Sequence, residues 1–130
     1  MEYKLEIGAS YTAEKMVKYE DTAIALGSGQ VGVFATPAMI LLMEEAALHA
    51  VQAALPEEST TVGVTVNIQH LSATLAGKMV TSTATLKEIN GRRLVFDVEA
   101  SDENGIIGKG THERVIINTE DFMWKLWHNE

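Results

Sequence analysis

The most regular hydrophobic pattern in the chain lies in residues 36–55 and has the period of an α-helix. Successive helical residues turn by about 100°, so Glu45, His49 and Gln52 cluster on one narrow polar stripe. Apolar side chains occupy most of the remaining circumference: Met39, Met43, Ala46, Ala50 and Ala53 lie opposite the stripe, and Ile40, Leu48, Val51 and Leu55 lie on one flank. A helix that is apolar around most of its surface is buried on most sides, so we expect a central helix.

Residues at both ends of this segment favour helix boundaries. Thr36 suits the N-cap because its hydroxyl can accept a hydrogen bond from a free backbone N–H. Pro37 suits the first helical position, where its missing N–H costs nothing. Pro56 is expected to stop the helix.

Two adjacent glutamates fall in different places on this helix. Glu44 lies on the apolar flank, where a carboxylate is costly unless it is paired, protonated or functional. Glu45 lies on the polar stripe four residues before His49, which is typical of a solvated surface pair. A purely structural role therefore explains Glu44 least well.

Beyond the helix the hydrophobic period changes to two. Val62, Val64, Val66 and Ile68 alternate with polar residues and predict a half-buried strand over about 60–74. The remaining strands are expected at about 10–19, 78–89, 92–102 and 106–118, with tight turns at Ala76-Gly77, Asn90-Gly91 and Asn104-Gly105. Four strands in succession beside one apolar helix predict an α+β fold, in which one antiparallel sheet wraps the helix.

Two segments flank this framework. Residues 20–33 hold several glycines and predict either a mobile lid before the helix or a plain connection. Thr119 is expected to cap a short C-terminal helix that begins with acidic residues. Its apolar side would come from Phe122, Leu126 and one of Trp124 and Trp127, as packing groups.

Composition narrows the class of protein. The 130 residues are 46% hydrophobic, which fits one globular domain over 1–130. The chain has no cysteine, no run of about 20 apolar residues and a charged, alternating N-terminus, so we expect a cytoplasmic protein that does not enter a membrane. A net charge of −8 argues against nucleic acid as a partner.

Three residues are candidates for chemistry, each with a structural alternative. Thr36 would lie beside the free N–H groups of a helix start, yet it could be only a cap. His70 could carry a proton near neutral pH, yet it could be only a hydrogen-bonded structural histidine. The four histidines lack the spacing of metal ligands, so no metal site is expected, and His112 has a structural interpretation within its strand.

Several motifs and the spacing between them resemble the fluoroacetyl-CoA thioesterase family over roughly residues 5–123. They are Val33-Phe34-Ala35-Thr36, Leu42-Met43-Glu44, His70 followed by Ser72-Ala73-Thr74, Gly91-Arg92-Arg93-Leu94 and Gly110-Thr111-His112-Glu113-Arg114. The resemblance implies a hot-dog fold, in which the sheet wraps a long central helix, and an active site at the interface of a homodimer.

The resemblance also implies roles for individual residues. The family's catalytic threonine, glutamate and histidine correspond to Thr36, Glu44 and His70. A glycine that helps to bind the acyl carbonyl or water corresponds to Gly63, and an arginine near the site corresponds to Arg114. The implied reaction is hydrolysis of a small acyl-CoA to the free acid and coenzyme A. Coenzyme A is part of the substrate, and no separate cofactor is implied.

One departure from the family changes the expected selectivity. The fluoroacetyl-specific enzyme has aromatic residues before its threonine that gate the acyl pocket, whereas this chain has Gly27, Ser28, Gly29 and Gln30. It also has Pro37 where the family has glycine. We therefore expect little preference for fluoroacetyl over acetyl, with the hydrolytic residues retained. A non-catalytic acyl-CoA sensor and a hot-dog dehydratase are the alternatives.

The expected geometry raises one question. Thr36 and Glu44 are eight residues apart, which is about 12 Å along a regular helix and roughly 80° around its axis. Either the first turn is irregular, or two subunits complete each site. The homodimer that the resemblance implies favours the second arrangement.

Overall fold

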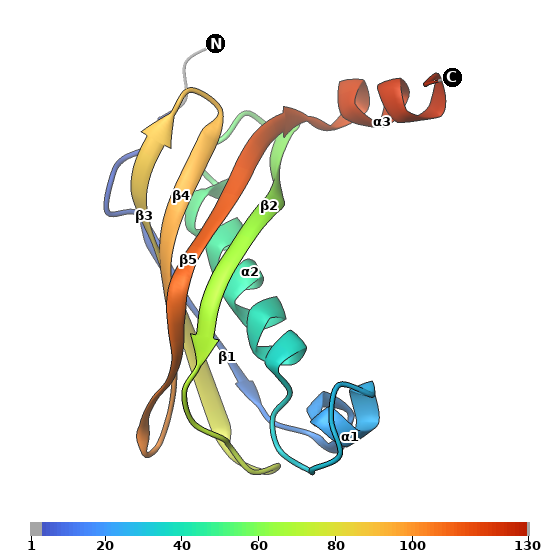
Figure 1. The fold of residues 1–130 in the computed structure, drawn as a ribbon. Helices are drawn as coiled ribbons and strands as arrows, with labels where there is room; N and C mark the ends of the chain where they lie inside the picture. The colour runs from blue at the N-terminus through green and yellow to red at the C-terminus, as the bar shows by residue number, and fades with distance from the viewer. Residues whose placement is uncertain (1–3, 130) are drawn as a thin grey trace.

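A computed structural model describes residues 4–129, which form an antiparallel sheet wrapped around one long helix (Figure 1). The strands run in the order β1-β3-β4-β5-β2. Their bounds are β1 Ser10–Met16, β2 Ser59–His70, β3 Met79–Asn90, β4 Arg93–Asp102 and β5 Gly105–Asn118. The long helix is α2 Thr36–Gln52, preceded by a 3-10 turn η1 Tyr19–Asp21 and α1 Ala23–Leu26, and α3 Thr119–Trp127 ends the chain. The α+β prediction is confirmed.

Two tight hairpins join the central strands, as their sequences predict. Asn90 pairs with Arg93 across a two-residue loop, and Gly91 in that loop has a φ of 62°, which favours glycine. Asp102 pairs with Gly105 across the second loop. The sheet therefore keeps β3, β4 and β5 adjacent.

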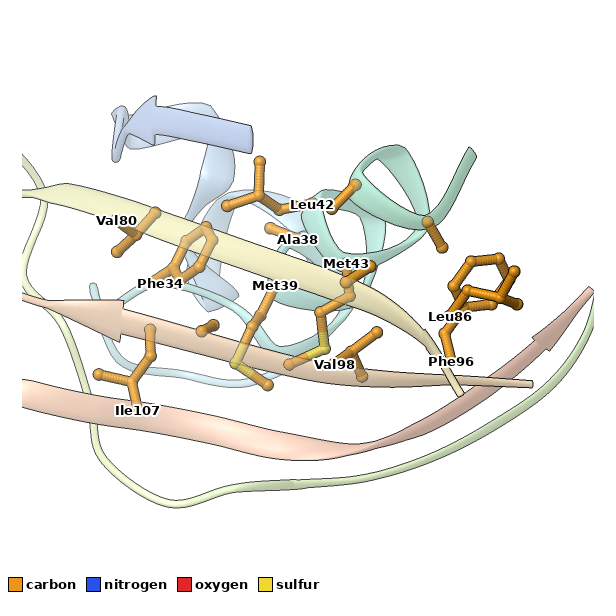
Figure 2. Close-up of a cluster of buried hydrophobic side chains, with 14 of the residues drawn as sticks. Phe34, Ala38, Met39, Leu42, Met43, Val80, Leu86, Phe96, Val98 and Ile107 are labelled. Atoms are coloured by element: carbon orange, nitrogen blue, oxygen red, sulfur yellow. The ribbon is translucent and has the colours of Figure 1, made fainter. Parts of the chain in front are cut away.

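The core lies between α2 and the inner face of the sheet. The helix buries Ala38, Met39, Leu42, Met43, Ala46, Ala47 and Val51. Figure 2 shows several of these side chains facing Val80, Leu86, Phe96, Val98 and Ile107 of the sheet. The helix packs mainly on β1 and β3, so the inner face of β2 is only partly covered and Val66 remains 40% exposed.

Both ends of α2 differ from the prediction. Ala35 occupies the N-cap, Thr36 is the first helical residue, and no side chain caps the helix. The Thr36 hydroxyl is directed to His70 instead, which is why it does not cap. The helix ends at Gln52, before Pro56. Its last turn closes as a 3-10 turn, in which the Ala54 N–H donates to the Val51 carbonyl and the Leu55 N–H donates to the Gln52 carbonyl.

The strand predicted over 60–74 contains a bulge that the alternating pattern hides. Gly63 pairs with Arg114, whereas Thr65 pairs with Glu113, so Val64 is an extra residue in β2. Residues paired across an antiparallel sheet share a face, and Val62 and Val66 therefore lie on opposite faces. The bulge turns Gly63 toward the helix.

Smaller corrections concern the remaining boundaries. β1 ends at Met16 rather than at 19, and β2 ends at His70 rather than at 74. Residues 20–33 contain the end of η1 and all of α1, followed by an exposed loop. Among residues 4–129, no helix has both the length and the apolar character needed to cross a bilayer.

The C-terminal helix is present but is capped and placed differently from the prediction. The Asn118 side chain, not that of Thr119, caps α3 by accepting from the Asp121 N–H at 3.0 Å. The helix projects from the end of β5 (Figure 1), and Trp127 is 76% exposed instead of packed. Trp124 stacks on His128.

Candidate active site

Thr36 and His70 meet where the first turn of α2 approaches the end of β2. Thr36 Oγ1 lies 2.7 Å from His70 Nδ1, and the two atoms share a hydrogen bond. Backbone bonds hold the segments before and after these residues: the Phe34 N–H donates to the Thr74 carbonyl at 2.8 Å, and the Leu71 N–H donates to the Ile107 carbonyl at 2.6 Å. We call Thr36 and His70 the helix-start pair.

An open hollow of about 390 Å³ lies beside this pair. Its walls come from α1, from the loop before α2 and from residues 70–73. The lining includes Ser28, Gly29 and Val31, and its one phenylalanine, Phe34, is buried at 1% exposure. A small acyl group bound here would lie against Thr36 and His70. A larger hollow on the outer face of the sheet, of about 640 Å³, contains none of the five candidate residues.

The environment of His70 favours the neutral imidazole. Burial lowers the pKa of His70, and the nearby Ser72 backbone opposes that shift only in part. Its Nε2 atom is buried, and within the described part of the chain nothing hydrogen-bonds to it. A neutral ring bonded to the Thr36 hydroxyl can accept a proton, as a general base must.

Glu44, midway along α2, and Arg114 of β5 form a second group. Arg114 Nη1 lies 3.5 Å from Glu44 Oε2 in an ion pair. The Arg114 side chain is only 8% exposed, whereas that of Glu44 is 39% exposed. The prediction that Glu44 is buried is therefore wrong for this chain, because the flank of α2 that bears it overhangs the uncovered part of β2. Its carboxylate is held by a cation yet reachable by a ligand.

Arg114 is itself fixed by neighbours on the sheet. Its Nε donates to Thr61 Oγ1 at 2.7 Å, and its Nη2 donates to the Thr61 carbonyl at 2.9 Å. Its Nη1 lies 3.2 Å from His112 Nε2. Burial lowers the pKa of Arg114 and Glu44 opposes this, but a guanidinium keeps its charge in proteins. We call Glu44, Arg114, His112 and Thr61 the mid-helix network.

Gly63 lies directly beneath this network. A Cβ at this position would be 2.7 Å from Glu44 Oε2 and 3.4 Å from Arg114 Nη1. Only glycine lets the strand pass this close to the carboxylate. The bulge in β2 explains how Gly63 comes to face Glu44.

The neighbouring glutamate is a contrasting case. Glu45 is exposed as predicted. The predicted pair with His49 has a different form: His49 Nδ1 lies 2.8 Å from the Glu45 backbone carbonyl, and its ring stacks on Tyr11 at 5.0 Å. The Glu45 carboxylate is not part of either site group.

The structure thus places the five candidate residues in two groups of one chain. Thr36 contacts His70, and Gly63 and Arg114 surround Glu44. The interpretation of His112 as only structural missed its contact with Arg114, and Thr61 was not singled out at all. The signal for His112 was the spacing: His112 and Arg114 are two residues apart on one strand, so they share a face.

Comparison with known proteins decides the family. A family model described as fluoroacetyl-CoA-specific thioesterase matches residues 17–120. The fluoroacetyl-CoA thioesterase of Streptantibioticus cattleyicolor is 42% identical over 94 residues, which cover 72% of this chain and 68% of that protein. The chain belongs to the fluoroacetyl-CoA-specific thioesterase family.

Solved structures agree on the fold. A structure of a fluoroacetyl-CoA thioesterase superposes with a TM-score of 0.90 at 33% identity, covering 97% of this chain and 98% of that chain. A hot-dog-like protein from Thermanaerovibrio acidaminovorans superposes with a TM-score of 0.87 at 26% identity, covering 95% of this chain and 91% of that chain. The hot-dog fold predicted from the motifs is confirmed.

Proposed function

We propose that this protein hydrolyses the thioester of a small acyl-CoA, releasing the free acid and coenzyme A. Thioester hydrolysis is the activity of the family to which the chain belongs. The observation that carries the proposal is the hydrogen bond between Thr36 and His70 beside an open hollow. Coenzyme A enters as part of the substrate, and the reaction uses no separate cofactor.

The two site groups would divide the chemistry between them. In the direct route, a water oxygen attacks the thioester carbon, the water's proton passes to His70 either directly or by way of Glu44, and the C–S bond breaks. The departing sulfur takes a proton back from His70. In the covalent route, the Glu44 carboxylate attacks the thioester carbon and the C–S bond breaks, which leaves an anhydride and the coenzyme A thiolate. Water then hydrolyses the anhydride, and His70 passes the water's proton to the thiolate. Thr36, the free N–H groups of the helix start and the Gly63 N–H would stabilise the oxyanion.

A homodimer would bring the two groups together. Thr36 and Glu44 are separated by about 12 Å along α2. Within residues 4–129 no strand pairs with the outer edge of β2, and Val64 and Val66 of this strand are exposed. A second subunit on this edge would cover these valines. It would also place its own Glu44 near the helix-start pair of the first.

Mixing two inactive subunits tests the shared site. Under the proposal, His70→Ala and Glu44→Gln each retain about one per cent or less of the parent activity as homodimers. A heterodimer of the two variants would contain one site with both residues intact, so up to half of the activity should return. No recovery in a verified heterodimer would show that each subunit supplies a whole site. A monomer mass by light scattering at micromolar concentration would reject the dimer.

The segment before Thr36 predicts the selectivity of the protein for the acyl group. Gly27, Ser28, Gly29 and Gln30 put no aromatic ring over the hollow, so fluoroacetyl-CoA and acetyl-CoA should be hydrolysed with similar kcat/KM. A preference of several orders of magnitude for the fluorinated substrate would contradict this.

Cytoplasmic location and a single domain over 1–130 stay predictions of the sequence.

The decisive experiment measures thiol release from a panel of short acyl-CoAs, with the products identified by mass. Thiol release together with the free acid supports the thioesterase. Binding without turnover would instead identify an acyl-CoA sensor. Addition of water to an enoyl-CoA would identify a dehydratase. Alanine at Thr36 should reduce the thiol release without unfolding the chain, since the Thr36 side chain caps nothing.

A further inference from the structure

His112 is a buried histidine that the proposed chemistry does not use. It lies on the inner face of β5 with 1% of its surface exposed, and its ring packs near Phe96. Its two ring nitrogens contact different partners: Nδ1 lies 2.8 Å from the Thr65 carbonyl, and Nε2 lies 3.2 Å from Arg114 Nη1. Both partners restrict the protons that the ring can carry.

These contacts fix one tautomer. A carbonyl oxygen can only accept, so Nδ1 must carry the proton that bonds to Thr65. A guanidinium nitrogen can only donate, so Nε2 must present its lone pair to Arg114. The ring is therefore neutral, with its proton on Nδ1.

We propose that His112 is a positioning residue whose neutral Nδ1–H tautomer holds the Arg114 guanidinium toward the Glu44 carboxylate. Thr61 binds Nε and Nη2 of the guanidinium, and His112 binds one side of Nη1. The remaining side of Nη1 is thereby directed to Glu44 Oε2 at 3.5 Å. The proposal rests on the proposed function only in taking Glu44 as the catalytic carboxylate.

Protonation of His112 would undo this arrangement. A proton on Nε2 would face an N–H of Arg114, and two cations would be buried in contact. Burial lowers the pKa of His112, the Thr65 carbonyl opposes the shift, and Arg114 lowers it further. Of the charged groups that act on the ring, Glu44 and Glu113 favour protonation. Burial and Arg114 outweigh them, which keeps the ring neutral at and above neutral pH.

Two replacements separate the positioning role from simple packing. His112→Gln can donate to Thr65 through its amide nitrogen and accept from Arg114 through its oxygen, and it does not titrate. His112→Phe keeps a buried ring but loses both hydrogen bonds. We expect His112→Phe to lower kcat by about tenfold and His112→Gln to stay within about threefold of the parent, because a catalytic group moved by 1 Å can lose more than this.

A double-mutant cycle shows whether the effect passes through Glu44. In a Glu44→Gln background, His112→Phe should cost less than about twofold further in kcat, because coupled residues are not additive. A purely structural role predicts the same loss in both backgrounds, with melting temperature falling in parallel. Equal losses, or unchanged kcat in a folded His112→Phe variant, would overturn the proposal.

A measurement on the unaltered protein tests the proposal even if the His112 variants fail to fold. Long-range ¹H–¹⁵N spectra distinguish the two neutral tautomers of a histidine, and His112 should carry its proton on Nδ1. A proton on Nε2 would overturn the proposal, since that atom could not accept from Arg114. If the parent protein releases no thiol, the proposed function fails, while the tautomer still decides whether His112 holds Arg114.

Discussion

The helix-start pair and the mid-helix network each contain one residue of α2 but are built in different ways. Thr36 and His70 share one side-chain hydrogen bond, and backbone bonds of the flanking loops hold them in place. In the mid-helix network, the hydroxyl and the carbonyl of Thr61 in β2 and the His112 ring in β5 fix Arg114 at three nitrogens, and Nη1 also faces Glu44. We therefore expect the first group to adjust to a ligand more readily than the second.

This difference matches the work proposed for each group. A group beside an acyl hollow must admit and release substrates, and loops supply such movement at low cost. A carboxylate that attacks a carbonyl or activates water must be held within a fraction of an ångström, because misplacement is costly in rate. Changes to the network should therefore reduce turnover more than changes to the loops.

The largest effect is expected at Glu44. Glu44→Gln keeps the size of the side chain but removes the charge that faces Arg114, so turnover should fall by about 100-fold or more. Glu45→Gln is the matched control one residue away, exposed and outside both groups. It should change turnover little and the free energy of unfolding by less than about 0.5 kcal/mol. Equal losses in steady-state rates for the two variants would assign Glu44 a structural role.

A methyl group at Gly63 should have the next largest effect. The added Cβ would come within 2.7 Å of Glu44 Oε2, so the carboxylate must move. We expect Gly63→Ala to lower kcat by about tenfold or more. Gly32→Ala is the control, because the nearest atom to its Cβ is Ile24 Cδ1 at 4.0 Å. If rapid-mixing assays gave both variants the parent rate, the strand would not support Glu44.

How much the sequence predicted also differs between the two groups. Periodicity placed the helix and strands, because one buried face per element leaves a clear pattern. It did not predict the bulge, since Val62, Val64, Val66 and Ile68 alternate without interruption in the sequence. The contacts of Arg114 with Thr61 and of Thr36 with His70 join residues far apart in sequence, which no local pattern records. The resemblance to the family motifs identified the candidate residues, and only the structure showed which residues they contact.

Acid should inactivate the protein through the helix-start pair. His70 must be neutral to accept a proton, and burial lowers its pKa from 6.5, so kcat/KM should hold from neutral pH down and fall only below 6.5. His112 also has a lowered pKa. Both shifts favour the neutral ring in the folded chain, so their stabilisation is full above 6.5 and is lost as pH falls through the folded pKa values.

Paired pH titrations of activity and of the melting temperature check this. The His112→Gln variant should keep the acid fall in kcat/KM, because His70 remains, while its melting temperature should depend less on pH. A profile with no acid fall at any pH at which the protein stays folded would exclude His70 as the base, since protonation of the ring abolishes that role.

The smallest effect on turnover is expected from the loop that supports the helix-start pair. Thr74 is buried, and its hydroxyl donates to Asp102 Oδ2 at 2.7 Å, while its carbonyl accepts from the Phe34 N–H at 2.8 Å. Thr74→Val keeps the shape of the side chain but removes the donor to a carboxylate. The free energy of unfolding should fall by about 1.5–3 kcal/mol, the usual range for hydrogen bonds to charged groups.

Turnover should respond far less than stability in this variant. The backbone bond from Phe34 survives the substitution, so kcat should change by about threefold at most, well below the effect of moving Glu44. Thr12→Val is the control, because its hydroxyl contacts Thr83 Oγ1 at 2.7 Å in an exposed pair. Urea titration should show a loss below about 0.5 kcal/mol there. A loss of activity in Thr74→Val as large as that in Glu44→Gln would mean that the helix-start pair is as rigidly required as the mid-helix network, and the proposed division between them would be wrong.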